Sequence, residues 1–352
     1  MITKEEVVRI LEDSINAPSG SNSQPWRFEF SNNELKIIAL PEKDHPILNY
    51  RNRGTWVAHG ALIENIIISS KAHGYTPLFE IFPDKNNKNL TAVFKFEKSN
   101  PEEEPLFPYI AQRATNRKPY QKTRLTGDQK NKLLEVVPKM SGVEVKFVEE
   151  QELVKELAEA SSASEIVTLE NQTLHKLFFE EIVWSRKEEA KKGKGLYLKT
   201  MELKPPQELV LRLVKRWSVM NFLNKIGFAR KIATDNAKAY SSCATMIGIV
   251  VSGEDQSFLD AGRVMERLWL QAAKMKLGLH LMSGTLFFYQ VISAGEKKIF
   301  SEEHTRLITQ AYQKIEQALG VKEGLIALLL RTGFTKEPSA YSTKKKPIID
   351  FS

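Results

Sequence analysis

The sequence has 352 residues, of which 42% are hydrophobic and 27% charged, a composition that is typical of a globular chain and excludes general disorder. Its single cysteine, Cys243, excludes an internal disulfide and a cysteine-ligated metal site, and the apolar run around it predicts a buried core residue. The net charge of +8 is regional, because residues 185–231 hold thirteen lysines and arginines against four glutamates.

The first residues predict a helix followed by a hairpin. Thr3 and Glu6 form a capping box that begins a helix ending near Ile15. Aromatic and polar residues alternate over 26–30, and an apolar run over 35–40 returns, as expected of two antiparallel strands. The acidic N-terminus lacks the pattern of a signal peptide, and no apolar run approaches the ~20 residues that span a bilayer. We therefore expect a cytoplasmic location.

Residues 56–74 are apolar on most faces, which predicts a buried helix ending at Gly74. Two strands are expected next, at 78–82 and 90–97. The acidic, proline-rich residues 97–108 then separate this first lobe from the rest of the chain.

A similar order of elements recurs in the second half. Thr126 and Gln129 form another capping box, and a second long apolar helix is expected to stop at Gly278. The expected elements are a helix at 130–137, a strand at 143–149, a helix at 151–166, a strand at 244–252, a helix at 261–278 and a strand at 324–334. We interpret the recurrence as a diverged duplication.

A basic insertion, residues 185–235, interrupts the second lobe. An amphipathic helix is expected to begin at the double proline 205–206. Three interpretations remain open: a surface helix packed on its own domain, a mobile cover over a ligand site, and a helix that lies on a membrane surface through residues 205–231.

Several familiar sites are absent from the sequence. It has no glycine-rich dinucleotide motif and no P-loop, the six histidines show no metal-ligand spacing, and the serine-hydrolase elbow is missing. No nucleic-acid module is recognisable. We therefore expect no metal site and no nucleic-acid partner.

Two polar stretches are candidates for a binding site. Residues 17–26, APSGSNSQPW, leave backbone N–H groups exposed around Asn22, which suits an anionic or polar ligand, although a rigid helix-to-strand loop is the alternative. Arg113 and Arg117 are four residues apart and can share a helical face with Thr115 between them, a set that suits a phosphate.

Two further stretches add to this set. Residues 342–348, STKKKPI, form a cationic cluster near the C-terminus. Residues 278–288 present the backbone of Met282, Ser283 and Gly284 beside apolar residues, an arrangement that suits the rim of a flat heteroaromatic ring.

Together these stretches resemble the nitroreductase family of flavin enzymes. Residues 17–28 are close to the family loop PSxxNxQPW, and RATNR at 113–117 resembles its arginine phosphate motif with threonine in place of serine. RTGF and KKKPI resemble its C-terminal segment. Here the loop precedes the arginines, an order similar to the two-lobed, Acg-like branch. This chain resembles a dimer that is fused into one chain and keeps one complete site.

The resemblance implies an α+β, nitroreductase-like fold of two pseudo-repeated lobes, 1–100 and 108–352, each with a mixed or antiparallel sheet packed by helices. It implies FMN as the cofactor, with its ribityl chain and ring against the loop, its 5′-phosphate on the arginines and C-terminal lysines, and its N5 edge near residues 282–284. The implied cofactor-binding residues are Pro18, Ser19, Ser21, Asn22, Gln24, Arg113, Thr115, Arg117, Met282, Ser283, Gly284, Lys345 and Lys346.

The resemblance also implies the reaction. NAD(P)H would pass a hydride to flavin N5, and a small-molecule electron acceptor such as a nitroaromatic or a quinone would then be reduced. This chemistry demands no acid–base side chain, so no catalytic residue is named. If residues 185–235 cover the flavin, the alternative is a flavin-sequestering protein with little turnover. A fused pseudo-dimer is compatible with either a monomer or a dimer in solution.

Overall fold

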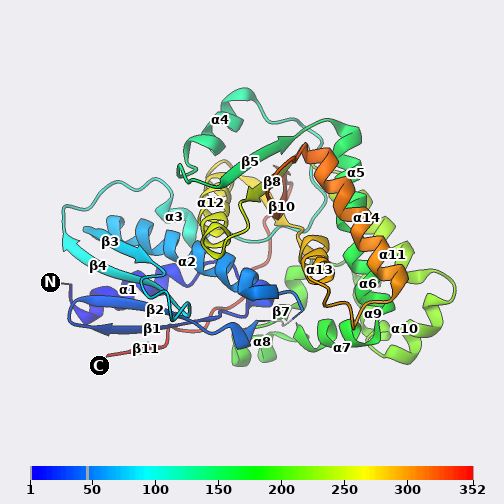
Figure 1. Ribbon diagram of the computed structural model, residues 1–352, viewed down its shortest axis with the longest axis horizontal. Coiled ribbons are helices and arrows are strands. Elements are labelled where there is room, and N and C mark those ends of the chain that lie inside the picture. The colour runs from blue at the N-terminus through cyan, green and yellow to red at the C-terminus, as the bar shows by residue number, and fades with distance from the viewer. Residues whose placement is uncertain (1, 45–46, 352) are drawn as a thin grey trace.

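The computed structural model describes residues 2–44 and 47–351, and its fold is a mixed α+β arrangement in which helices pack on two main sheets (Figure 1). The first lobe contains α1 (Lys4–Ser14), β1 (Trp26–Ser31), β2 (Glu34–Ala39), α2 (Arg53–Ala72), β3 (Tyr75–Ile81) and β4 (Leu90–Lys98). The second contains α4 (Gly127–Glu135), β5 (Val143–Val148), β8 (Thr245–Val251), α12 (Asp255–Lys274), β9 (Leu277–Leu281) and β10 (Leu325–Phe334). The predicted α+β class, with sheets packed by helices, is confirmed.

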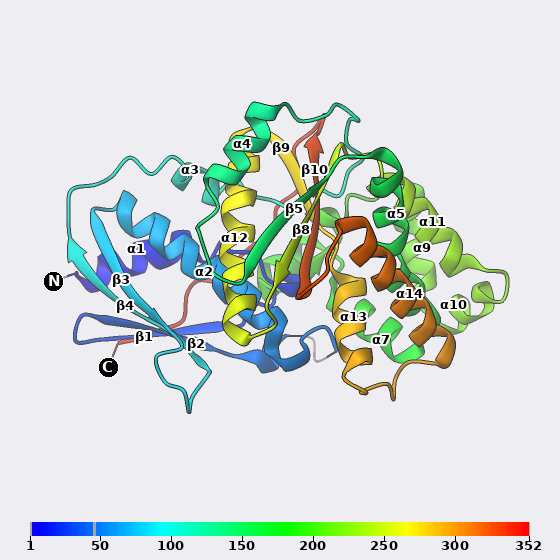
Figure 2. The ribbon, with the colours of Figure 1, turned by 45° about the horizontal axis from the view of Figure 1, so that its top comes forward.

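The two lobes share one order of elements. Each has a helix, two strands, a long helix and two more strands. The strand order is β1-β2-β4-β3 in the first sheet and β5-β8-β10-β9 in the second, so corresponding strands occupy corresponding places. Figure 2 shows the second sheet lying against α12. This arrangement agrees with the predicted repeat.

The ends of the two long helices also correspond. Both α2 and α12 are 20 residues long, and each is followed by a capping residue and then by one residue in the left-handed region. These residues are Gly74, with φ 81°, and Lys276, with φ 59°. The expectation that Gly278 ends the second helix is wrong, because Gly278 lies inside β9. Glycine is needed there for packing, since a Cβ would lie 2.4 Å from Thr335 Cγ2.

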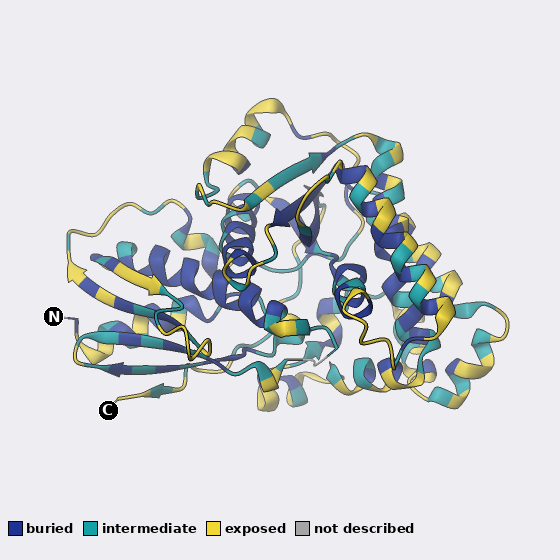
Figure 3. Cartoon of the chain, viewed as in Figure 1, coloured by how far each residue is buried: buried dark blue, intermediate teal, exposed yellow. Residues whose placement is uncertain are grey.

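Helices α2 and α12 cross at the centre of the molecule, where both are buried (Figure 3). A Cβ on Gly60 would lie 1.8 Å from the carbonyl oxygen of Leu259, and a Cβ on Gly262 would lie 2.0 Å from that of Val57. Gly60 and Gly262 are each the eighth residue of their helix, so the contact is reciprocal, as in an interface between two equal partners. The absence of two side chains therefore sets how closely the lobes approach.

The remaining helices belong to the second lobe or connect the lobes. They are α3 (Phe107–Ile110), α5 (Gln151–Ser161), α6 (Ala163–Glu170), α7 (Gln172–Glu181), α8 (Arg186–Lys192), α9 (Pro205–Val214), α10 (Trp217–Asn224), α11 (Phe228–Tyr240), α13 (Gly284–Ser293) and α14 (Glu302–Leu319). The helix expected at 151–166 is divided at Ser162, and the basic insertion holds several short helices where one was expected. The short strands β6 (Ile182–Val183) and β7 (Leu196–Tyr197) pair with each other.

The C-terminal segment returns to the first lobe. After β10, the chain runs back across the molecule, and β11 (Ile349–Asp350) pairs in parallel with β1 (Figure 1). The capping boxes at Thr3 and Thr126 and the burial of Cys243 are confirmed. Within the described residues, no helix combines the length and the apolar character needed to cross a bilayer.

The reciprocal glycine contact makes a prediction about stability. Replacing Gly60 with Ala forces the two helices apart, and we expect a loss of about 2–3 kcal/mol or more in the free energy of unfolding, measured by denaturant titration. Gly127→Ala is the matched control, because a Cβ there meets nothing within 4 Å, and it should be neutral or slightly stabilising. Equal stability of the two variants would contradict the close helix crossing.

Candidate functional site

The loop at residues 17–25 has an unusual backbone. Ser21, Asn22 and Gln24 have φ values of 45°, 55° and 52°, although none of them is glycine. Non-glycine residues in the left-handed region are costly and are held in place by their surroundings. The end of the loop is fixed by His59 of α2, whose Nε2 donates to the Pro25 carbonyl at 2.8 Å, and burial lowers the pKa of His59 to about 4.

Two polar side chains of the loop bind distant segments. The Asn22 amide donates to the Thr343 carbonyl at 3.0 Å. The Gln24 amide donates to the Gly193 carbonyl at 2.6 Å, and its oxygen accepts the backbone N–H of Lys345 at 2.9 Å. The loop is therefore the meeting point of three segments that are far apart in the sequence.

Cationic side chains enter the same region. Lys344 Nζ donates to Asn22 Oδ1 at 2.7 Å and to the Ala17 carbonyl at 3.1 Å. Arg113 donates to the Asn16 carbonyl at 2.9 Å and lies over the ring of Trp269. Glu266 of α12 supplies the opposite charge, 3.6 Å from Arg113 Nε. The structure thus brings the loop, Arg113 and the C-terminal lysine run together.

The lysine at the loop was missed by the sequence analysis. Lys345 and Lys346 are exposed, and the residue whose side chain enters the loop is Lys344. Three consecutive lysines in an extended segment point in alternating directions, and the sequence alone does not say which one faces inward. The cofactor-binding roles of Lys345 and Lys346 stay predictions.

The charges at this place suit an additional anion. Burial, reinforced by the nearby Arg113, lowers the pKa of Lys344 to about 7. Burial raises the pKa of Glu266 to about 7, although Arg113 opposes this effect. The Nε of Arg113 is buried and has no hydrogen-bond partner among the described residues. Two cations facing one carboxylate, with an unused N–H donor, fit a group such as a phosphate.

Arg117 and Thr115 lie differently from the expectation. Residues 113–117 form no helix, so the interpretation of Arg113 and Arg117 as neighbours on one helical face is wrong. The chain is extended there because Thr115 forms a parallel bridge with Leu279 of β9. The guanidinium of Arg117 instead donates to the Thr200 carbonyl at 2.7 Å, whereas the guanidinium of Arg113 donates to the Asn16 carbonyl.

Residues 282–284 are held by the second lobe. The backbone N–H of Met282 donates to the Leu329 carbonyl at 2.8 Å, and Ser283 Oγ accepts the N–H of Leu329 at 3.1 Å. Gly284 begins α13 and packs so closely on Ser164 that a Cβ would lie 2.6 Å from its Oγ. These contacts tie the segment to β10 and α6, and its predicted contact with the flavin ring stays a prediction.

The end of α7 and the first part of the insertion contact the candidate site. We call residues 181–202 the covering segment. Ser21 Oγ donates to Glu181, and the Gly193 carbonyl accepts from Gln24. At its other end, Glu202 accepts the backbone N–H of Arg117 at 2.6 Å. The covering segment therefore bridges the loop of the first lobe and the arginine motif of the second.

The covering segment also holds the C-terminal segment. Glu189 of α8 is buried and accepts both the N–H and the hydroxyl of Thr343, the latter at 2.8 Å. Gly193 ends α8 with φ 56°, and a Cβ on it would lie 2.9 Å from Lys345 Cγ. Glycine at this position thus allows the backbone to approach the lysine run closely.

A separate cavity of about 440 Å³ lies between α7 and the insertion. Phe179, Trp184 and Trp217 are among the residues that line it, and none of the thirteen predicted cofactor-binding residues does. Within residues 2–44 and 47–351, no cluster of three or more histidine, cysteine, aspartate or glutamate side chains is arranged to hold a metal ion.

No family model matches the chain. A curated relative, an uncharacterized protein of Mycobacterium tuberculosis, is 22% identical over 285 residues; the match covers 80% of this chain and 39% of the relative, so the chain spans about two fifths of that protein's length.

Similar solved structures include nitroreductases. One with bound FMN from Bacteroides fragilis has a TM-score of 0.37 at 11% identity, covering 69% of this chain and 94% of its own. Another with bound FMN from Desulfitobacterium hafniense has a TM-score of 0.37 at 12% identity, covering 68% and 95%. An iodotyrosine deiodinase bound to FMN and 3-iodo-L-tyrosine has a TM-score of 0.37 at 12% identity, covering 70% and 98%.

The raised pKa of Glu266 predicts a pH dependence of stability. The folded state holds the Glu266 proton more tightly than the unfolded state, so stability falls as pH rises from 4.5 to about 7. We expect Glu266→Gln to remove roughly 3 kcal/mol of this fall. Denaturant titrations of both proteins between pH 4.5 and 7 check the difference, and parallel curves would contradict the raised pKa of Glu266.

Proposed function

We propose that the chain binds one FMN at the loop formed by residues 17–25 and works as an FMN-dependent oxidoreductase. The observation that carries this proposal is the meeting of Lys344 and Arg113 at a loop whose sequence resembles the flavin loop of nitroreductases. Two cations, of which Arg113 is buried and Lys344 half-buried, together with one carboxylate and an unused N–H, are suited to a phosphate, the only strongly charged part of FMN.

In this proposal Arg113 and Lys344 hold the phosphate. A bound dianion favours the charged form of Lys344 and raises its lowered pKa, so ligand binding and protonation support each other. The backbone N–H groups of Asn22 and Gln24 donate to Ser19 within the loop, at 3.1 and 3.0 Å, so the expectation of exposed N–H groups around Asn22 is wrong for these two residues. Arg117 belongs to the far side of the site, next to Thr200 and Glu202, and Thr115 pairs with Leu279 of β9.

FMN supplies the two-electron chemistry when it is bound, with NAD(P)H as the proposed donor and a nitroaromatic or quinone as the proposed acceptor. The chain's own groups position it and exclude water. Lys344 and Arg113 fix the phosphate end of FMN by charge. The covering segment shields the loop from solvent through Glu181 and Gly193. None of these groups has to transfer a proton.

The covering segment favours a second candidate function. Its hydrogen bonds to Ser21, Gln24 and Arg117 join both halves of the proposed site. If these contacts persist with FMN bound, NAD(P)H has no face of the flavin on which to stack, and the protein stores FMN. The two functions differ in whether this segment opens during a donor's approach.

The phosphate assignment predicts the behaviour of two lysine variants. Lys344→Glu places a negative charge beside the proposed phosphate, and we expect FMN to bind at least roughly 30-fold more weakly, measured by quenching of flavin fluorescence. Lys85→Glu is the matched control, because Lys85 is exposed between β3 and β4, and it should bind within about threefold of the unmodified protein. Equal affinities of the two variants would contradict the assignment, and a stoichiometry of two FMN per chain would contradict a single site.

The contacts of the covering segment lead to a prediction of how fast NADPH or NADH reduces the bound flavin. Glu189→Ala removes both bonds to Thr343, and we expect faster bleaching of the flavin absorbance by NADPH or NADH under anaerobic conditions. Glu188→Ala is the matched control, since Glu188 pairs with Lys192 on the same helix. In the oxidoreductase, the unmodified protein bleaches as well; in the storage protein, it bleaches only with dithionite. No bleaching in any variant would exclude nicotinamide as the donor.

A further inference from the structure

The helices α9 and α10 expose large apolar side chains. Leu209 is 61% exposed, Leu213 57%, Phe222 67% and Ile226 76%, and among the described residues these are four of the five most exposed large hydrophobic side chains. Single exposed apolar residues are ordinary, but four within 18 residues of sequence are not. This segment presents an unpartnered apolar surface.

These side chains face away from the protein's own core. On the inner side of the same helices, Val214 and Met220 are buried with Phe179 in one hydrophobic cluster. Leu209 and Leu213 are four residues apart and share one face of α9, whereas Phe222 lies on α10 and Ile226 lies in the turn that follows α10. The apolar surface is therefore additional to the packing that holds the two helices in place.

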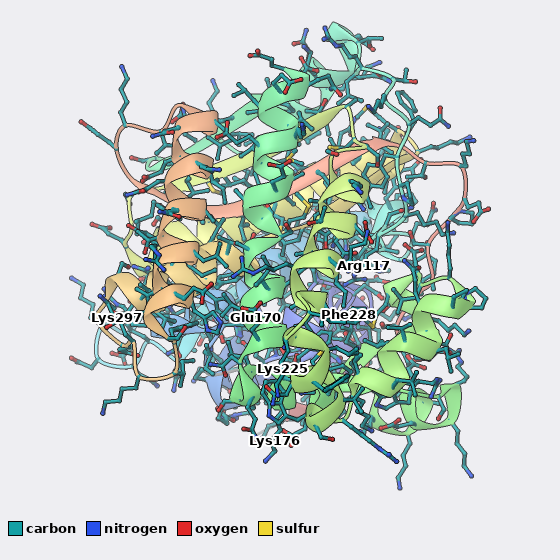
Figure 4. The ribbon with its side chains drawn as sticks, turned by 90° about the vertical axis from the view of Figure 1, so that its right-hand side faces the viewer. Arg117, Glu170, Lys176, Lys225, Phe228 and Lys297 are labelled. Carbon is teal, nitrogen blue, oxygen red and sulfur yellow. The ribbon has the colours of Figure 1, made fainter. Side chains whose placement is uncertain are left out.

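Unpaired positive charge surrounds this surface. Residues 204–231 contain seven lysines and arginines and one acidic residue, Glu208, which pairs with Arg212. Arg216 and Lys225 form no ion pair within residues 2–44 and 47–351. Figure 4 shows this helical end of the molecule, with Lys225 and Phe228 at the connection from α10 to α11.

We propose that α9 and α10 bind the surface of a membrane that contains anionic lipids. The apolar side chains enter the boundary between headgroups and acyl chains, and the flanking cations contact the headgroup phosphates. A second copy of this chain is a poorer occupant, because a symmetric contact through residues 204–231 brings two cationic surfaces together. The proposal is independent of FMN binding.

Cosedimentation with vesicles tests the proposal. The protein should bind vesicles of 70% phosphatidylcholine and 30% phosphatidylglycerol at low salt and should bind pure phosphatidylcholine at least about tenfold more weakly. Raising the salt concentration should weaken binding to the anionic vesicles. Leu213→Ser combined with Phe222→Ser should lower the partition coefficient at least about tenfold, since two apolar anchors are lost.

Matched variants distinguish binding through this surface from nonspecific binding through other exposed apolar residues. Leu78→Ser combined with Leu134→Ser alters residues that are 48% and 45% exposed elsewhere, and it should leave vesicle binding unchanged. Circular dichroism establishes that each variant is folded. Absence of binding to anionic vesicles, or an equal loss in both double variants, would overturn the proposal. Self-association of the unmodified protein that Leu213→Ser with Phe222→Ser abolishes, without vesicle binding, would instead assign the surface to a second copy.

Discussion

The crossing of α2 and α12 at Gly60 and Gly262 is the contact on which the rest of the structure depends. A backbone carbonyl of each helix occupies the place where a side chain of the other would stand, so the two lobes have one separation and one angle. This fixed geometry lets the loop before β1, the segment before α4 and the C-terminal segment meet, although they are far apart in the sequence. The candidate site is thus a consequence of how the lobes pack.

The two lobes have the same architecture, but residues at corresponding positions make different contacts. Glu64 and Glu266 are each the twelfth residue of their helix. Glu64 pairs with Arg263 and Arg267 of the opposite helix, whereas the corresponding positions opposite Glu266 are Ala61 and Asn65. Glu266 is therefore left to face Arg113. One carboxylate supports the contact between the lobes, and the other lies beside Arg113 at the candidate site.

Much of the fold could be predicted from the sequence because it depends on local signals. The capping boxes at Thr3 and Thr126 and the long apolar helices follow from residue types and periodicity alone. The end of α12 could not be predicted, because glycine is the residue expected in the left-handed region after a helix. Here Lys276, and not the nearby Gly278, adopts that conformation. The loop at 17–25 was recognisable from its composition, but the choice of Lys344 over its neighbours and the separation of Arg113 from Arg117 depend on long-range contacts that leave no local pattern.

We propose that the loop, the covering segment and the C-terminal segment form one unit around a bound flavin. Hydrogen–deuterium exchange with and without FMN tests it most directly, because exchange reports protection of each segment separately. We expect FMN to slow amide hydrogen exchange in all three segments, residues 17–25, 181–202 and 343–345, with little change in α9 and α10. Unchanged exchange in all three segments, or protection confined to the cavity lined by Trp184 and Trp217, would contradict it.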